Sequence, residues 1–302
     1  MMCKVGQGYV FEEGEELFVQ MMGISVSARQ IQRVSEYYGN RIGHREDGHI
    51  KQGKKMATVA GPKEPVYVMM DGAMIFTREE GWKEMKTGRI FAAKDVVGIQ
   101  PKRNAITNSL YVCHLGNHKQ FTGKMEAYCD EYNHKICVAD GAPWIWNWIE
   151  NAYSETTQIL DFYHAAERLG ACAKSYFPEE QQRKLWLEAQ KQRLLNNEVD
   201  GVIGTVEQLP SVRNKEARKA REDLLRYYRT NQHRMQYKTY LQQGYLIGSG
   251  PIESAHRHVV QHRLKLSGQR WSKPGAQSIV NLRAYQKSNR WSEVIDCIRK
   301  AA

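Results

Sequence analysis

Two stretches of the chain have the same form: VYVMMDG at residues 66–72 and KICVADG at residues 135–141. Each is a short apolar run of the kind that forms a buried strand, and each ends in Asp-Gly. A third acid, Glu253, follows the sequence GSGPI, whose proline favours the first turn of a helix. We therefore expect Asp71 and Asp140 at the ends of two strands and Glu253 at the start of a helix.

These three carboxylates are the candidate catalytic and metal-binding residues. Oxygen ligands suit Mg²⁺ and Mn²⁺. Two such ions can hold the attacking and leaving oxygens of an in-line phosphoryl displacement. A strand-end aspartate also caps turns well, and this simpler explanation is sufficient for Asp71 or Asp140 taken alone. Together, and in a basic protein, the three acids favour a two-metal site that acts on nucleic-acid phosphate.

The order of elements predicts an α/β fold: an RNase H-like mixed sheet flanked by helices. The composition between about residues 166 and 245 is almost wholly helical, with a break near 201–210, which predicts a helical insertion before the last acid. The elements expected before this insertion are strands at 66–71, at 74–77 and at 82–91 with a turn near Gly88, a helix at 119–132, the strand that ends at Asp140, a helix opened by Pro143, and a strand at 157–161.

The N-terminal region predicts a helical hairpin, with one helix ending at Gly23 and a second at residues 28–38. One face of the second helix carries Arg29, Gln32 and Arg33, side chains suited to base edges in the DNA major groove. A helix-turn-helix and an ordinary helical hairpin are both compatible with this pattern.

A predicted linker at residues 40–65 divides the chain. The predicted first region, residues 1–62, is helix-turn-helix-like and includes most of the linker. The predicted second region, residues 63–302, is the RNase H-like catalytic domain.

Charge is distributed unevenly along the 302 residues, whose net charge is +11. Residues 201–302 hold 19 Lys and Arg against 7 Asp and Glu, so the whole positive excess lies in the last third. This excess indicates either a phosphate-binding face or a solvated helical surface. No apolar run reaches the roughly 18 residues that a membrane span needs. The six scattered cysteines are typical of free thiols in a reducing cytoplasm.

Several further motifs resemble one family when they are read in order. The chain is similar to bacterial DDE transposases of the Kra-type insertion-sequence family, over roughly residues 15–295. The blocks that carry this resemblance are YVMMDG at 67–72, GWKEMKTGR at 81–89, ADGAPWIWN at 139–147, ILDFYHA at 159–165, IGSGPIES at 247–254 and KLSGQRW at 265–271.

The resemblance implies that Asp71, Asp140 and Glu253 form the metal-binding triad with two Mg²⁺ or Mn²⁺ ions. It also implies accessory roles for Asp161 and His164, which match a D-x-x-H position of related families. A histidine packed at a strand–helix corner is an equal alternative for His164.

Three other residues are candidate DNA contacts. Arg257 follows Glu253 by one helical turn and can meet phosphate or pair with that acid. Arg270 and Trp271 can stack on an unpaired base at a cleaved end, although a core tryptophan is the simpler explanation for Trp271.

The function expected is that of a DNA transposase, which cleaves and transfers strands at the terminal inverted repeats of an insertion sequence. The expected setting is the bacterial cytoplasm, with the protein bound to end and target DNA as a homo-oligomer and not to a membrane. The family usually has a longer N-terminal region, so we expect a truncated copy. An RNase H-like nuclease or resolvase, and an inactive DNA-binding remnant, stay open as alternatives.

Overall fold

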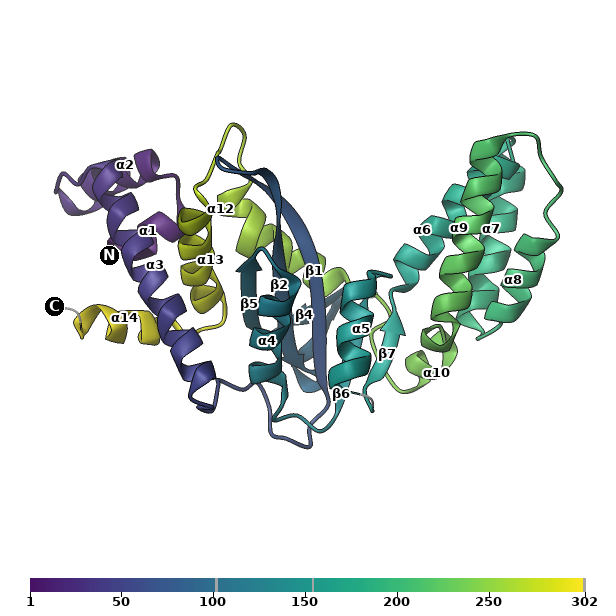
Figure 1. Cartoon of the computed structure of the whole chain (residues 1–302), viewed down its shortest axis with the longest axis horizontal. Helices are drawn as coiled ribbons and strands as arrows, with labels where there is room; N and C mark the ends of the chain where they lie inside the picture. The colour runs from purple at the N-terminus through teal and green to yellow at the C-terminus, as the bar shows by residue number, and fades with distance from the viewer. Residues whose placement is uncertain (101–102, 154, 301–302) are drawn as a thin grey trace. The chain divides into compact units, whose positions relative to one another are not determined.

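A computed structural model describes residues 1–100, 103–153 and 155–300 of the chain (Figure 1). Five strands make a mixed sheet in the order β5-β2-β1-β6-β7. Their bounds are β1 Val66–Thr77, β2 Gly81–Ala92, β5 Leu110–Leu115, β6 Lys135–Ala139 and β7 Thr157–Leu160. With flanking helices, an N-terminal helical hairpin and a helical insertion before Glu253, this sheet confirms the predicted α/β fold class.

The chain packs as two compact units, which are described separately. Unit 1 consists of Met1–Lys135 and Gly250–Ala302, and unit 2 of Ile136–Ser249. The predicted division near residue 62 stays a prediction.

The long antiparallel pair β1–β2 forms the centre of unit 1. Its register runs without a break from Val66 opposite Ala92 to Thr77 opposite Gly81. The sequence predicted two strands in place of β1 and a turn near Gly88 in β2, and both expectations were wrong. Gly88 lies within the ladder, where a Cβ would come 2.2 Å from Met125 Sδ. The glycine therefore makes room for a neighbouring side chain and does not bend the strand.

The N-terminal helices are α1 (Met2–Gly8), α2 (Phe11–Met22) and α3 (Ala28–Lys51). Helix α2 ends at Gly23, whose φ of 66° is left-handed, and the Ser27 side chain caps α3 by accepting from Gln30 N. The predicted second helix therefore exists but is longer than expected. Residues 40–51 belong to it, so the predicted linker at 40–65 was wrong over that part.

Two glycines explain why α3 continues through a region that resembles a linker in composition. The helix packs against α13 (Lys273–Lys287), and a Cβ on Gly39 would lie 2.1 Å from the Ser278 carbonyl oxygen. A Cβ on Gly43 would lie 2.4 Å from Asn281 Nδ2, and the same amide donates to the Gly39 carbonyl at 3.0 Å. The glycines are therefore contact points between helices and not helix ends.

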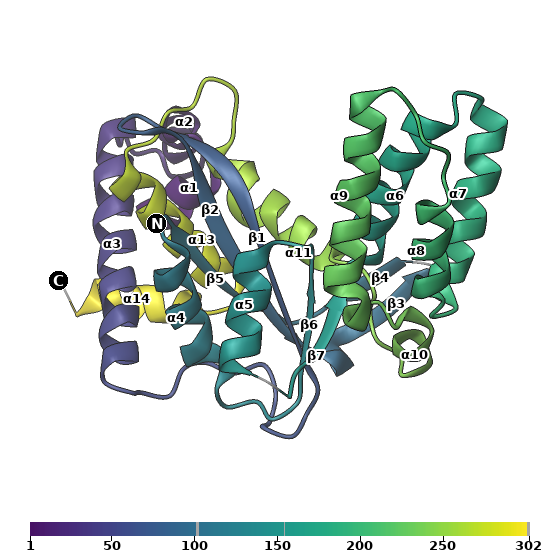
Figure 2. The ribbon, with the colours of Figure 1, turned by 45° about the vertical axis from the view of Figure 1, so that its right-hand side comes forward.

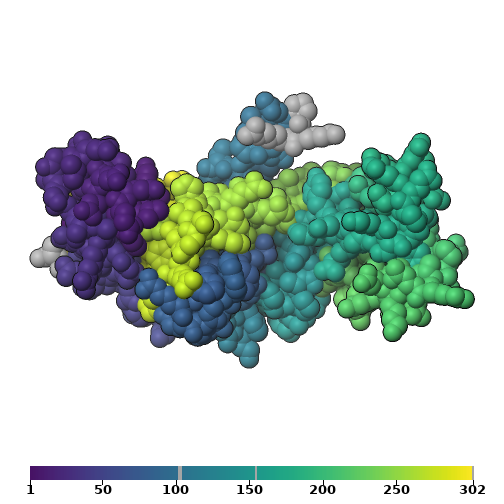
Figure 3. Space-filling model, turned by 90° about the horizontal axis from the view of Figure 1, so that it is seen from above, coloured from purple at the N-terminus to yellow at the C-terminus, as the bar shows by residue number. Residues whose placement is uncertain are grey.

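Within unit 1, helices from the N-terminal part of the chain pack against helices from its C-terminal part. Helices α1 and α3 both contact α13, and α3 also contacts α14 (Trp291–Arg299). Figures 1 and 3 show the purple N-terminal helices directly against the yellow C-terminal ones. The remaining elements of unit 1 are η1 (Ala93–Asp95), β3 (Val96–Gln100), β4 (Arg103–Ile106), α4 (His118–Cys129), α11 (Gly250–Ala255), the π-helical segment η3 (His256–Gln261) and α12 (His262–Leu264).

Unit 2 begins with the parallel pair β6–β7 and continues into helices (Figure 2). Their bounds are α5 Pro143–Ala152, α6 Phe162–Tyr176, α7 Glu180–Leu195, α8 Val199–Glu207, α9 Lys215–Asn231, η2 Gln232–Arg234 and α10 Tyr237–Gln242. Pro143 opens α5 as expected. The predicted break near 201–210 was misplaced, because α8 covers its first part and the connection to α9 follows Glu207.

All six cysteines are free thiols in the structure, and all six side chains are buried. Among the residues that the structure describes, no helix is both long and apolar enough to cross a membrane.

The close contact between α3 and α13 gives a prediction for stability. Gly39→Ala is expected to lower the free energy of unfolding by about 1–3 kcal/mol, because the new methyl group overlaps the backbone of Ser278. The control is Gly123→Ala in α4, where a Cβ meets nothing within 4 Å. This change should raise the free energy of unfolding by about 0.5–1 kcal/mol. Urea denaturation of both variants checks this, and equal shifts would show that α3 does not approach α13 closely.

Candidate functional site

Asp71 lies in the middle of β1 and not at a strand end, so that part of the prediction was wrong. It stands opposite Thr87, because β2 continues the ladder past the Asp-Gly pair. The Asp71 side chain is 40% exposed, and its Oδ1 accepts a hydrogen bond from Gly72 N at 2.7 Å. The carboxylate is therefore held by the backbone and still open to solvent.

The glycine after Asp71 allows another acid to come close. A Cβ on Gly72 would lie 2.0 Å from Glu84 Oε1, so only glycine fits beside that carboxylate. The Lys86 ammonium donates to Glu84 Oε2 at 2.5 Å and to the Gly116 carbonyl at 2.9 Å. Sequence reasoning missed Glu84, which lies against Gly72, and its lysine partner compensates its charge. Gly72 and Asp71 face opposite sides of the sheet, so this contact does not bring Glu84 to the Asp71 carboxylate.

Glu253 lies on α11, as predicted, and its side chain is exposed. The helix packs against β1 and β2, the strands that carry Asp71 and its partner. One buried side chain fixes the start of the helix: Arg89 Nη1 donates to the Pro251 carbonyl at 2.8 Å. The sequence pattern indicated no role for Arg89, because its contact with residue 251 depends on tertiary packing.

The helical segment after Glu253 reaches Asp71 directly. His256 is 4% exposed, and its Nε2 lies 3.3 Å from Asp71 Oδ2. Glu253 and His256 are three residues apart, one turn along the helix. Unit 1 thus brings Asp71 next to the helix that holds Glu253.

Asp140 follows β6 directly, as predicted. Its Oδ1 accepts from Ala142 N at 3.0 Å, and its carbonyl accepts from Trp146 Nε1 at 2.7 Å. The Tyr227 ring of α9 packs directly against the adjacent Gly141, because a Cβ on Gly141 would lie 2.0 Å from Tyr227 Cε2. The helical insertion therefore contacts the turn that presents this carboxylate.

Asp140 and Asp161 lie at the same end of two neighbouring parallel strands. Ala139 and Leu160 are paired in register, and Asp161 N donates to the Ala139 carbonyl at 2.8 Å. The carboxyl ends of parallel strands are the usual place for a ligand site in an α/β sheet. Unit 2 therefore brings these two acids to one edge.

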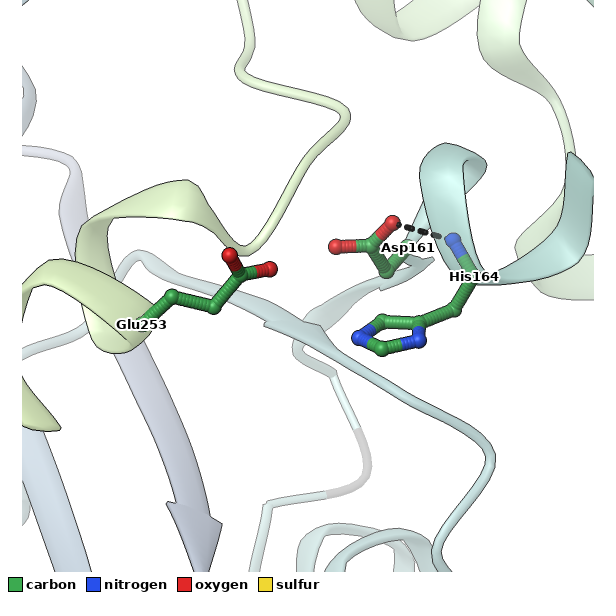
Figure 4. Close-up of side chains that lie close together, drawn as sticks. All are labelled: Asp161, His164 and Glu253. Atoms are coloured by element: carbon green, nitrogen blue, oxygen red, sulfur yellow. Dashed lines mark hydrogen bonds between the residues drawn. The ribbon is translucent and has the colours of Figure 1, made fainter. Parts of the chain in front are cut away.

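Asp161 has a clear structural role within unit 2. Its side chain is fully buried, and Oδ1 accepts from His164 N at 2.9 Å, which caps α6 (Figure 4). Its Oδ2 accepts from Ser249 N at 2.5 Å, so the same carboxylate joins the beginning and the end of the helical insertion. Phe162 N also donates to the Ile247 carbonyl at 2.9 Å.

The His164 side chain is partly exposed, with Nδ1 3.6 Å from Glu167 Oε2. Glu253, which Figure 4 also draws, belongs to unit 1. The accessory roles of Asp161 and His164 stay predictions.

The predicted DNA contacts fall into exposed and buried groups. Arg29, Arg33 and Arg257 are exposed, and Arg257 makes no ion pair within the described part of the chain. Gln32 is half-buried and donates to Glu36 Oε1 at 2.8 Å. Since glutamate already binds its amide, Gln32 would have to break this bond in order to read a base.

Arg270 and Trp271 lie beside the end of β1. Trp271 is 6% exposed and its N donates to the Phe76 carbonyl at 3.1 Å, which favours the core interpretation of this tryptophan. Arg270 is exposed and, with Gln32 and Trp271, lines a cavity of about 250 Å³. Unit 1 therefore brings three predicted DNA contacts to one hollow.

The basic last third of the chain contributes both exposed and buried cations. Its residues are shared between the two units, and three of its arginines are buried: Arg234, Arg263 and Arg283. The Arg263 guanidinium lies over the rings of Phe11 and Trp271 and donates to the Gly6 carbonyl at 3.0 Å. Burial lowers the pKa of Arg263 and of Arg283 to about 10. Part of the arginine excess is thus core packing, not phosphate contact.

A comparison with protein families places the chain. The model of an uncharacterised protein family, UPF0236, matches residues 32–295. The chain belongs to UPF0236. A search of curated proteins found no match. The UPF0236 match includes β1, β6 and α11, the elements that carry the three predicted acids.

Asp161 gives a prediction for this UPF0236 protein that concerns stability alone. Asp161→Ala removes the acceptor of two buried N–H groups, so the free energy of unfolding should fall by about 2–4 kcal/mol. The matched control is Asn214→Ala, which removes the exposed cap of α9 in the same unit. It should cost only about 0.5–1 kcal/mol. Chemical denaturation of both variants checks this, and an equal loss would mean that Asp161 is an ordinary helix cap.

Proposed function

We propose that this UPF0236 protein is a metal-dependent DNA transposase, which cleaves strands at the ends of an insertion sequence and joins them to target DNA. The sequence blocks that resemble DDE transposases support this function. The observation that carries it is the packing of α11, the helix of Glu253, against β1, with His256 Nε2 3.3 Å from Asp71 Oδ2. An acid on the first strand and a late acid on a helix beside it are what a DDE site requires.

The chemistry of the donor groups fits Mg²⁺ or Mn²⁺, which prefer carboxylate oxygens. Asp71 and Asp140 each have one oxygen fixed by a backbone N–H, and both side chains are only partly buried. Glu253 is exposed. We propose that Asp140 of unit 2 acts with the two acids of unit 1, and that together they hold two ions.

The chemistry proposed is transfer of a phosphoryl group in two steps. A bound divalent ion supplies an activated water and stabilises charge on the leaving oxygen. In the first step the water oxygen bonds to phosphorus, the bond to the 3′-oxygen breaks, and a free 3′-hydroxyl and a 5′-phosphate result. In the second step the oxygen of this 3′-hydroxyl bonds to a target phosphorus, the bond from that phosphorus to the target's own 3′-oxygen breaks, and the proton of the attacking hydroxyl passes to the leaving 3′-oxygen. The three carboxylates orient the reacting groups in both steps.

Exposed cations on both units supply candidate phosphate contacts. In unit 1 they are Arg29 and Arg33 on α3 and Arg257 after α11. In unit 2 they lie at the start of α9, at Lys215, Arg218 and Lys219. Arg221 is less suitable, because it is half-buried and donates to the Leu209 carbonyl at 3.1 Å. Cations that neutralise phosphate release condensed counterions and make binding salt-dependent.

The triad gives the first prediction for this function. Asp71→Asn, Asp140→Asn and Glu253→Gln should each lower the rate of Mg²⁺-dependent cleavage of end DNA by about 10³-fold or more, a loss of roughly 4 kcal/mol of transition-state stabilisation. Binding of DNA should persist, because each change removes a metal ligand and not a phosphate contact. Gel assays of cleavage and of binding check the two expectations separately.

The control for the triad is Glu16→Gln, which changes an exposed acid on α2 and should leave cleavage unchanged. Near-normal cleavage by any of the three variants would exclude that residue from the triad. Joining of the cleaved 3′ end to a second DNA separates a transposase from a nuclease or resolvase, which would cleave without joining. Binding without cleavage by the wild type would indicate an inactive remnant.

The cations at the start of α9 give the second prediction. Replacing Lys215, Arg218 and Lys219 with alanine should flatten the slope of log K against log salt by about one for each phosphate that the variant no longer neutralises. The change should be the same on end DNA and on random DNA, because phosphate contacts carry no base information. The control is Lys184→Ala on α7, a lysine already paired with Glu180 at 2.5 Å. An unchanged slope in the triple variant would mean that this end of α9 is only a solvated surface.

A further inference from the structure

The His256 imidazole is buried although no hydrogen bond compensates the burial of its ring nitrogens. It is 4% exposed, and neither ring nitrogen has a hydrogen-bond partner among the residues that the structure describes. Asp71 lies beside it, with His256 Nε2 3.3 Å from Asp71 Oδ2, a distance within ion-pair range but without the alignment of a hydrogen bond. A buried polar group that lacks a partner destabilises the folded state, so an apolar side chain would suit this position better if packing were its only role.

The backbone around His256 is also unusual. The chain leaves α11 in a π-helical segment, His256–Gln261, and short π-helical insertions occur frequently at functional sites. Two following residues, Val259 and Val260, are buried and apolar, so this segment has a sufficient apolar contact surface without the imidazole. Since Arg89 fixes the start of α11 at the Pro251 carbonyl, the segment presents His256 to β1 from a fixed position.

We infer that His256 is a positioning residue for the Asp71 carboxylate, and this inference rests on the metal-dependent function proposed above. Gly72 N holds Oδ1 at 2.7 Å, and His256 Nε2–H, once aligned, donates to Oδ2. The two donors together fix the rotation of the carboxylate. Each carboxylate oxygen has a second lone pair, so both contacts leave room for a divalent ion. Groups that orient ligands in this way change metal affinity by about 10–100-fold when they are removed.

The test uses Mn²⁺ alone as the probe, with calorimetric titration of the whole chain. His256→Leu fills the same space without a donor and should weaken Mn²⁺ binding by about 10–100-fold. His256→Gln places an amide N–H near the position of Nε2 and should restore most of that affinity. The control is His258→Leu in the same π-helical segment, where the native His258 Nε2 lies 3.2 Å from the Tyr111 hydroxyl. This control should leave Mn²⁺ affinity unchanged.

If His256 had only a structural role, the Mn²⁺ titration and urea denaturation of His256→Leu would give a different result. In that case His256→Leu would change the urea midpoint and leave Mn²⁺ affinity at the wild-type value, which would overturn the inference. Equal weakening by the leucine and glutamine variants would overturn it too, because the donor would then not matter. Asp71→Asn tests the metal site separately from the role of His256. If this variant binds Mn²⁺ as tightly as the wild type, Asp71 is not a metal ligand, and the positioning role of His256 is wrong too.

Discussion

The contact of one buried guanidinium with a helix terminus determines where the acids of unit 1 lie. Arg89 is 6% exposed on β2, and it donates to the Ser109 hydroxyl at 3.0 Å and to the Pro251 carbonyl at 2.8 Å. The two acceptors are a hydroxyl and a carbonyl oxygen, so they pair with two of its N–H groups without bringing another charge into the interior. Because the start of α11 is attached to the sheet in this way, both Glu253 and His256 are presented from a fixed helix. The relation between Asp71 and Glu253 depends on that attachment.

A second buried side chain has the corresponding role in unit 2. Asp161 binds Ser249 N and His164 N with its two carboxylate oxygens, so the helices between β7 and Ser249 leave and return at one point. The insertion also contacts the turn after β6, through Tyr227 against Gly141. The large helical segment therefore supports the strand ends where Asp140 lies. Its other proposed contribution is the cationic start of α9.

The apolar runs predicted β6 and β7 well, but β1 was predicted as two strands and no strand was named at β3, β4 or β5. The meaning of the glycines also depended on tertiary contacts. Asp140-Gly141 and Asp71-Gly72 are the same dipeptide, yet the first ends a strand and the second lies inside one. The difference is the partner strand, since β2 continues the ladder through Asp71 and no local pattern indicates how far that partner extends. Gly39 likewise resembles a helix breaker in sequence, but in the structure it lies inside α3 and allows α13 to pack closely against that helix.

The acids of the candidate site were proposed from the sequence, and the residues that support them were found only in the structure. Asp71, Asp140 and Glu253 were selected from local motifs and from the family resemblance. Arg89 contacts the start of α11, and His256 reaches Asp71, only through tertiary packing. The sequence spacing places His256 one helical turn after Glu253 but does not indicate its contact with Asp71. The charge pattern misled in part, because buried arginines such as Arg263 stack on aromatic rings and cannot meet phosphate.

The most direct measurement for the metal site is cleavage of the protein chain by Fe²⁺ bound in place of Mg²⁺. With ascorbate and peroxide, bound Fe²⁺ produces hydroxyl radicals that break the backbone close to the ion, and mass spectrometry of the fragments locates the breaks. If Asp71, Asp140 and Glu253 hold the ions together, breaks should cluster near all three residues and disappear when excess Mg²⁺ competes. Breaks near only one or two of them, or breaks that Mg²⁺ does not suppress, would contradict a shared three-carboxylate site.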